Sequence, residues 1–266
     1  MLKNELDALI PKNGIETGIM LCYGDDIIYQ YNAAKNFPAA GIIDLGIIAY
    51  IEEQWKKDPK ILDEELEVTD LSRVRGTGII SKLGQNKWSI HDLIYLITSV
   101  GDNTASNLLI ERFDIYEIDE WLKKNYPGLR LGREFMRYSP TGQDNEVNAL
   151  SVMKILSHFI TSTNKFGELV RSGLQNHATK FYLTAMENTE LPIFNKSTHF
   201  NHLLHEVSAL RTQNGPLNLV LLTEYENSKS EDVEFIQNFG KLLYSRVKIP
   251  QLPKTGLTDL KNKINF

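Results

Sequence analysis

The stretch from Phe37 to Tyr50 constrains the fold most, because it joins a long apolar run to a single charge. It reads Phe-Pro-Ala-Ala-Gly-Ile-Ile-Asp-Leu-Gly-Ile-Ile-Ala-Tyr. The run leaves no polar face, so it predicts a helix from about Gly41 to Trp55 that is buried all round. Pro38 fits just before the start of such a helix and cannot lie inside it.

Asp44 is the one carboxylate at the head of this apolar run. The positive end of the helix dipole favours a carboxylate in the first turn. Burial still makes that charge costly unless it is paired or hydrogen-bonded. Two interpretations follow: a core helix with a half-exposed capping aspartate, or the floor of a functional site.

The composition places the chain among ordinary globular proteins. Its 266 residues suffice for one large domain or two intimately packed ones. The net charge of -5 argues against a general nucleic-acid binder, which would show a basic face. The single cysteine, Cys22, excludes an intrachain disulfide and fits a reducing compartment.

Nothing in the sequence predicts a membrane anchor. No segment approaches the roughly 18 consecutive apolar residues of a membrane span. Met1 to Leu9 is amphipathic and acidic, unlike a signal peptide. The chain as given is therefore expected in the cytoplasm, or outside it if a leader was removed. Leu252 to Gly256 matches the sortase signal Leu-Pro-x-Thr-Gly, but no apolar stretch follows it, so we interpret it as a chance match.

The order of periodic segments predicts an α+β fold, an α/β sandwich. Two short strands come first, about seven helices follow, and strands and a last helix close the chain. We expect a single domain over 1–266, in which 1–36 and 190–247 build one antiparallel sheet with flanking helices. Residues 37–189 would form a mostly helical subdomain, and 248–266 a polar tail. The elements expected after the buried helix are a helix capped by Ser89, the helices Thr104–Phe113, Ile118–Asn125, Asn148–Thr161 and Gly167–Asn176, the strands Leu191–Phe194, Leu203–Leu210 and Leu217–Thr223, and the helix Ser230–Val247.

Three segments in order resemble the motif set of class A β-lactamases and the related penicillin-binding serine hydrolases. That family carries Ser-x-x-Lys at the start of a buried helix, then Ser-Asp-Asn, then Lys-Thr-Gly on a strand. Here Phe37 to Asp44 aligns with the first motif, and Ser99 to Ile110 closely resembles the second. Phe194 to Thr198 holds the place of the third. The resemblance covers about residues 15–247 and implies a β-lactamase-like fold.

This chain departs from the family at the positions that carry the chemistry. The nucleophile position is Gly41, the lysine of the first motif is Asp44, and the serine of the second is Gly101. Asp102, Asn103 and Lys196 are retained, Ser197 keeps the hydroxyl of the family threonine, and Thr198 replaces a glycine. Nucleophilic catalysis needs a nucleophile beside a base that activates it. The matched positions lack both, because the nucleophile position is a glycine and the lysine position is an aspartate.

Several neighbouring residues are candidates for the old cleft or alternatives to it. Ser99, His199 and Glu146 are possible cleft residues, and we carry the family's deacylating glutamate onto neither Glu134 nor Glu146. His199, His202 and His205 are spaced by three, and on a strand that spacing turns the side chains to opposite faces. We therefore expect no metal site and no cofactor.

The resemblance and its departures together predict a pseudoenzyme. It would have lost acyl transfer and would bind an unknown small ligand, a peptide or a protein partner in the former substrate cleft. Asp44 should then face Lys196 and Asn103. The alternatives are a hydrolase with β-lactamase-type or repurposed chemistry on Asp44 and Lys196, and a scaffold whose cleft is filled by Tyr138, His199 or a neighbouring loop. The sequence names neither the ligand nor the oligomeric state.

Overall fold

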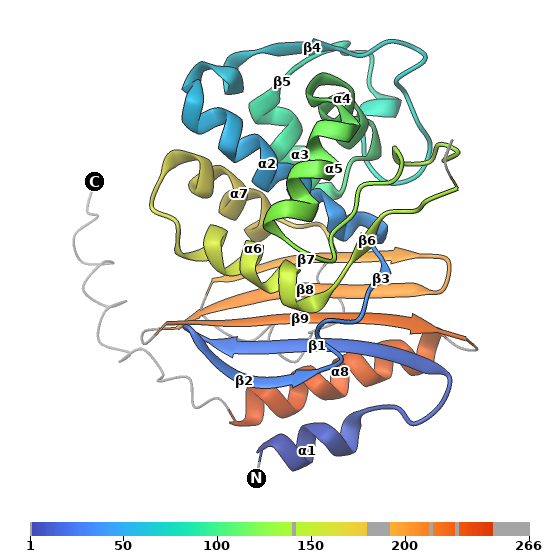
Figure 1. The fold of residues 1–266 in the computed structure, drawn as a ribbon, viewed down its shortest axis with the longest axis vertical. Helices are drawn as coiled ribbons and strands as arrows, with labels where there is room; N and C mark the ends of the chain where they lie inside the picture. Colours follow the sequence, from blue (N-terminus) through green and yellow to red (C-terminus); the bar gives the residue numbers. More distant parts are fainter. Residues whose placement is uncertain (1, 140–141, 180–191, 213–214, 227–228, 247–266) are drawn as a thin grey trace, which may run out of the picture.

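The computed structural model shows a five-stranded antiparallel sheet with helices on both faces (Figure 1). It describes residues 2–139, 142–179, 192–212, 215–226 and 229–246. The strands follow the order β2-β1-β9-β8-β7, so β7 is an edge strand. Their bounds are β1 Ile15–Tyr23, β2 Asp26–Tyr31, β7 Ile193–Phe200, β8 Leu203–Thr212 and β9 Gly215–Tyr225. The mixed α+β class and the antiparallel sheet are as predicted.

The two faces of the sheet support separate apolar cores. On one face pack α1 (Leu2–Leu9) and α8 (Lys229–Arg246). The other face carries the larger helical part. Its helices are α2 Ile43–Lys57, α3 Ile90–Val100, α4 Asn103–Phe113, α5 Ile115–Asn125, α6 Ala149–Thr161 and α7 Lys165–Gln175. None of the helices in the described part of the chain is long and apolar enough to cross a membrane.

Short elements connect the helical part. They are the strand pairs β3 Phe37–Pro38 with β6 Glu146–Val147 and β4 Glu65–Glu67 with β5 Lys87–Ser89, and the 3-10 turns η1 Ala40–Ile42, η2 Pro59–Asp63 and η3 Ile80–Lys82. The pairing of β3 with β6 brings the chain just before α2 beside the segment that leads into α6.

Helix α2 is the buried helix that the apolar run predicts. Every residue from Ile43 to Glu52 is buried. Its α-helical part begins later than expected, because η1 forms a tighter first turn. Close packing holds it: a methyl group added to Gly46 would lie 3.0 Å from Leu122. The half-exposed capping role for Asp44 is wrong, because this carboxylate is only 2% exposed.

Helix ends form where the sequence places capping residues. The Ser89 hydroxyl accepts the Asp92 N–H at 3.0 Å, as predicted for the start of α3. At the other end, Gly101 has φ +64° and its N–H donates to Ile97 O at 3.1 Å. Such a left-handed residue ends a helix and suits glycine, which has no Cβ to clash.

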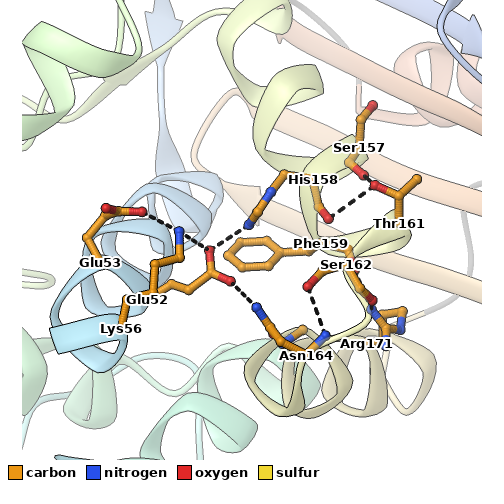
Figure 2. A network of polar contacts seen from close by, with 11 residues as sticks. Glu52, Glu53, Lys56, Ser157, His158, Phe159, Thr161, Ser162, Asn164 and Arg171 are labelled. Atoms are coloured by element: carbon orange, nitrogen blue, oxygen red, sulfur yellow. Dashed lines mark hydrogen bonds and ion pairs between the residues drawn. The ribbon is translucent and has the colours of Figure 1, made fainter. Parts of the chain in front are cut away.

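A polar network joins three helices at the far end of α2 (Figure 2). One Glu52 oxygen lies 2.6 Å from His158 Nε2 on α6, and the other accepts from Asn164 Nδ2 at 3.1 Å. Lys56, one turn on, lies 3.7 Å from Glu52 and 2.5 Å from Glu53. The network ties α2 to α6 and to the cap of α7.

Two further predictions need correction. The strands β7, β8 and β9 run further than the apolar runs indicated, because polar residues such as Ser197 continue the ladder. The polar segment 131–145, with Pro140 and two glycines, predicts a surface loop; its described residues are irregular, but its inner side is buried. Phe135 is buried there, and the Asn107 side chain bonds both its N–H (2.7 Å) and its carbonyl (3.0 Å). The Leu252–Gly256 match lies outside the described residues.

Candidate functional site

A cleft of about 760 Å³ lies between the start of α2, the junction of α3 and α4, and the edge strand β7. These elements bring residues far apart in the sequence to one place. The motif positions that line it are Gly41, Gly101, Asn103, Lys196, Ser197 and Thr198, together with His199. Asp44 lies just beneath this lining, bonded to Lys196.

Asp44 and Lys196 form a fully buried ion pair at the cleft floor. The Asp44 Oδ2 to Lys196 Nζ distance is 2.9 Å, and both side chains are 2% exposed. The same ammonium donates to the Ile97 carbonyl at 2.9 Å, and the other carboxylate oxygen accepts from Ser106 Oγ at 2.8 Å. The expected contact between Asp44 and Lys196 is confirmed. Asn103 does not join it, because its amide donates to Arg75 O at 3.2 Å.

The charge state of the pair is set by opposing effects. Burial raises the pKa of Asp44, and the nearby Lys196 ammonium and Ser106 hydroxyl oppose that rise. With its cation paired, the floor has no excess positive charge to offer an anionic ligand. Removing either partner would leave the other charge buried without compensation.

Gly41 and Thr198 face each other across the cleft floor. The Gly41 N–H donates to Thr198 Oγ1 at 3.2 Å. A methyl group added to Gly41 would lie 3.2 Å from that hydroxyl and 3.9 Å from Asp44 Oδ2. The Thr198 side chain thus uses the backbone donor of Gly41 and crowds the space where a side chain at 41 would stand.

Asp102 has a structural role. Its Oδ1 caps α4 by accepting from Thr104 N (2.9 Å) and Ala105 N (3.1 Å). Its Oδ2 accepts from Ile79 N (2.6 Å) and Ile80 N (2.8 Å). These four hydrogen bonds use the lone pairs of the carboxylate. Asp102 therefore fixes one wall of the cleft and has no acceptor left for a ligand.

Two buried groups that sequence reasoning missed support the β7 wall. His177 bridges α3 to the strand: its Nδ1 lies 2.8 Å from Thr98 O, and its Nε2 accepts from Ser197 N at 3.2 Å. Glu206 on β8 is hydrogen-bonded to the Ser197 hydroxyl, directly across the strand pair. A glutamate in a core-facing position of an apolar strand was the signal that could have found it.

Other sequence candidates take places outside the cleft lining. The Ser99 hydroxyl donates to Tyr95 O at 2.7 Å within its own helix. The Glu146 carboxylate accepts from Asn36 Nδ2 at 3.1 Å. Tyr138 is 90% exposed and does not fill the cleft.

His199 and His205 have different partners. His199 Nε2 lies 3.1 Å from the Tyr225 hydroxyl, whereas His205 Nε2 donates to Pro38 O at 2.8 Å. Burial lowers the pKa of His205 to about 4, so it is neutral near pH 7. Within the described ranges, no cluster of three or more His, Cys, Asp or Glu side chains is placed to hold a metal ion.

The antiparallel sheet with helices on both faces and the cleft at the β7 edge match a β-lactamase-like fold. A model of the family described as "Beta-lactamase enzyme family" (Beta-lactamase2) matches residues 1–247. The chain therefore belongs to the β-lactamase enzyme family.

Solved structures agree on the fold. A class A β-lactamase from Mycobacterium abscessus is 17% identical, with a TM-score of 0.80 over 92% of this chain and 98% of that one. A β-lactamase from Sphaerobacter thermophilus is 16% identical, with a TM-score of 0.78 over 90% and 94%. The structure of PBP-A is 14% identical, with a TM-score of 0.81 over 92% and 94%. No curated protein matches the sequence.

Proposed function

We propose that this protein is a non-catalytic binding or regulatory member of its family. In this proposal it has lost serine acyl transfer and keeps the cleft as a site for a small ligand, a peptide or a segment of a protein partner. The observation that carries the proposal is the buried Asp44–Lys196 ion pair at the cleft floor. Its two charges neutralise each other where the family motif would present two lysines.

The surroundings of the pair support the same conclusion. Acyl transfer needs a nucleophile within hydrogen-bond reach of a base. Gly41 supplies no side chain at the matched position, and the Lys196 ammonium is already bonded to Asp44 and to Ile97 O. The Gly41 N–H, a donor that could stabilise a developing oxyanion, is bonded to Thr198.

Intact-mass spectrometry after incubation with penicillin G tests this proposal. An active class A β-lactamase, blocked in deacylation, serves as the positive control. We expect no mass increase on this protein under conditions that fully acylate the control. A stoichiometric covalent adduct on this chain would overturn the proposal.

A second candidate is a hydrolase that uses Asp44 with Lys196. It is favoured by one observation: Asp44 is a carboxylate of raised pKa beside a lysine that lines the cleft. A screen with nitrocefin, esters and amides separates the two candidates. Saturable turnover that Asp44→Asn abolishes and Glu52→Gln preserves would favour the hydrolase, since Glu52 is an equally buried carboxylate away from the cleft.

A further inference from the structure

Behind the β7 wall of the cleft lie buried acceptors that the described residues do not fully satisfy. Glu206 is 2% exposed, and the one hydrogen bond that the described residues give its carboxylate comes from Ser197. Asn195, on the same face of β7, has a buried Oδ1 with no partner among the described residues. Its Nδ2 donates to Thr179 O at 2.7 Å and to Ser197 Oγ at 3.2 Å. Buried acceptors of this kind normally have a donor, so a ligand or water is expected to supply one.

No cation compensates Glu206 among the described residues. Its cross-strand neighbours are Ser197 on β7 and Leu221 on β9, both uncharged. Lys196 is next to Ser197 in sequence, but it extends from the opposite face of β7 to Asp44. Burial therefore raises the pKa of Glu206 to about 8.

The Ser197 hydroxyl has one hydrogen, and that hydrogen is already used whether Glu206 is ionised or protonated. When Glu206 is ionised, Ser197 donates to it. When Glu206 is protonated, the acid donates to Ser197, whose hydrogen then points to Thr179 O at 3.3 Å. In neither state does Ser197 have a hydrogen left for a ligand carboxylate. In the ionised state it has a lone pair for a ligand N–H, because Asn195 uses only one.

We infer that Asn195, Ser197 and Glu206 form a subsite for the ammonium or amidinium group of the ligand that enters this cleft. Ser197 lines the cleft and makes the contact, while the Glu206 carboxylate behind it supplies the countercharge. This inference rests on the proposed function, in which the cleft is a binding site, and adds the chemical class of the ligand. A lysine side chain, a peptide N-terminus and a free amine share this chemistry.

Isothermal titration calorimetry with matched probes tests the subsite. Benzylamine and benzamidine carry the cation, and benzoate carries the opposite charge on the same ring. We expect the wild-type protein to bind the cations at least about tenfold more tightly than benzoate. Glu206→Gln should remove that preference, because Gln can still donate to Ser197 but has no charge. A lysine-containing tripeptide is the arm that distinguishes a peptide source from a free amine.

Proton release is a second readout of the same contact. At pH 7 most of Glu206 is protonated, and a bound cation favours its ionised form. Amine binding should therefore release protons, seen as a dependence of the heat on buffer ionisation, and affinity should rise from pH 6 to pH 8. A second buried acid, Asp232 on α8, bonds Thr223 at 2.6 Å. It is present in both the wild type and the Glu206→Gln variant, so it cannot account for a difference between them. Glu206→Gln should abolish the release.

Glu224→Gln removes a carboxylate from elsewhere in the cleft lining and is the matched comparison. Equal losses in the Glu206 and Glu224 variants would overturn the inference, since general cleft charge would then explain the binding. The inference would also be overturned if benzoate bound as tightly as benzylamine, or if no cation bound at a probe concentration of about 10 mM. If Glu206→Gln unfolds, Ser197→Ala gives the test. Acylation by penicillin is measured separately, so failure here leaves the proposed function standing.

Discussion

Asp44 and Glu52 are two buried carboxylates on one helix, and their surroundings differ. Asp44 meets an equally buried lysine from β7, so its partner crosses from the sheet to the helical part. Glu52 meets His158 and Lys56, whose side chains are 42% and 44% exposed, and its partners all belong to the helical part. Water screens the Glu52 network in Figure 2, whereas nothing screens the Asp44 pair. Buried carboxylates on one helix therefore serve two purposes: Glu52 ties helices together, and Asp44 determines the charge of the cleft floor.

Breaking the buried pair should have the largest effect. Lys196→Met leaves Asp44 buried without its cation, and we expect a loss of about 3–5 kcal/mol in the free energy of unfolding. The double variant Asp44→Asn/Lys196→Met removes the unpaired charge and should regain most of that loss. Urea unfolding measures both. A loss below about 1 kcal/mol in Lys196→Met would show that the pair resembles the screened Glu52 network.

The pH dependence of the Lys196→Met variant sharpens the same contrast. Burial raises the pKa of Asp44, and this variant lacks the ammonium that opposes the rise. The folded state then keeps a proton that the unfolded state releases, so stability falls as pH rises above the unfolded pKa. The slope for one proton is about 1.4 kcal/mol per pH unit, up to the folded pKa. Urea unfolding between pH 5 and 8 measures it, and the double variant should lack this extra slope.

Gly41 and Gly46 lie near the start of α2, and the space around them differs. A methyl group on Gly46 would meet Leu122 at 3.0 Å and Leu129 at 3.2 Å, inside packed core. On Gly41 it would meet the Thr198 hydroxyl at 3.2 Å beside the open cleft. We expect Gly46→Ala to be less stable than Gly41→Ala by about 2 kcal/mol. Thermal and urea unfolding measure this, and equal stabilities would contradict the difference in packing.

Removing the charge of Glu52 should have the smallest effect. Glu52→Gln keeps a side chain that can bond Asn164 and His158, and the lost charge is partly screened. We expect a loss of about 1 kcal/mol, well below that of Lys196→Met. A loss as large as that of Lys196→Met would place the two carboxylates in the same class. Circular dichroism during urea unfolding gives the comparison.

The sequence predicted the fold and the central pair, for identifiable reasons. Apolar periodicity and caps such as Ser89 are local signals, so the helices could be placed. The motif order placed Asp44 opposite Lys196 although they lie far apart in the chain. Local patterns could not give the Thr198 contact with Gly41, because it depends on how β7 lies against η1.

The remaining residues depended on the three-dimensional arrangement. Ser99 is directed to its own helix, and Glu146 to Asn36, which spacing in the sequence does not show. Glu206 lies inside an apolar strand. Its proposed role depends on having no facing cation in the described residues, which the sequence around it does not show. The Glu52 network joins three helices whose mutual packing no single segment specifies.

The left-handed backbone at Gly101 bears on how such a chain could change over generations. A side chain at φ +64° is strained by about 1 kcal/mol, although the space itself is open, since an added Cβ would lie 4.0 Å from Lys196 Nζ. A hydroxyl residue placed at this position, as in the family motif, would therefore not be a neutral substitution. Gly41 meets the Thr198 hydroxyl, and Asp44 holds Lys196, so a family residue placed at either position is opposed by its present neighbour. Installing the family motif here would therefore require several changes together, so we expect no single substitution at 41, 44 or 101 to be accommodated without cost.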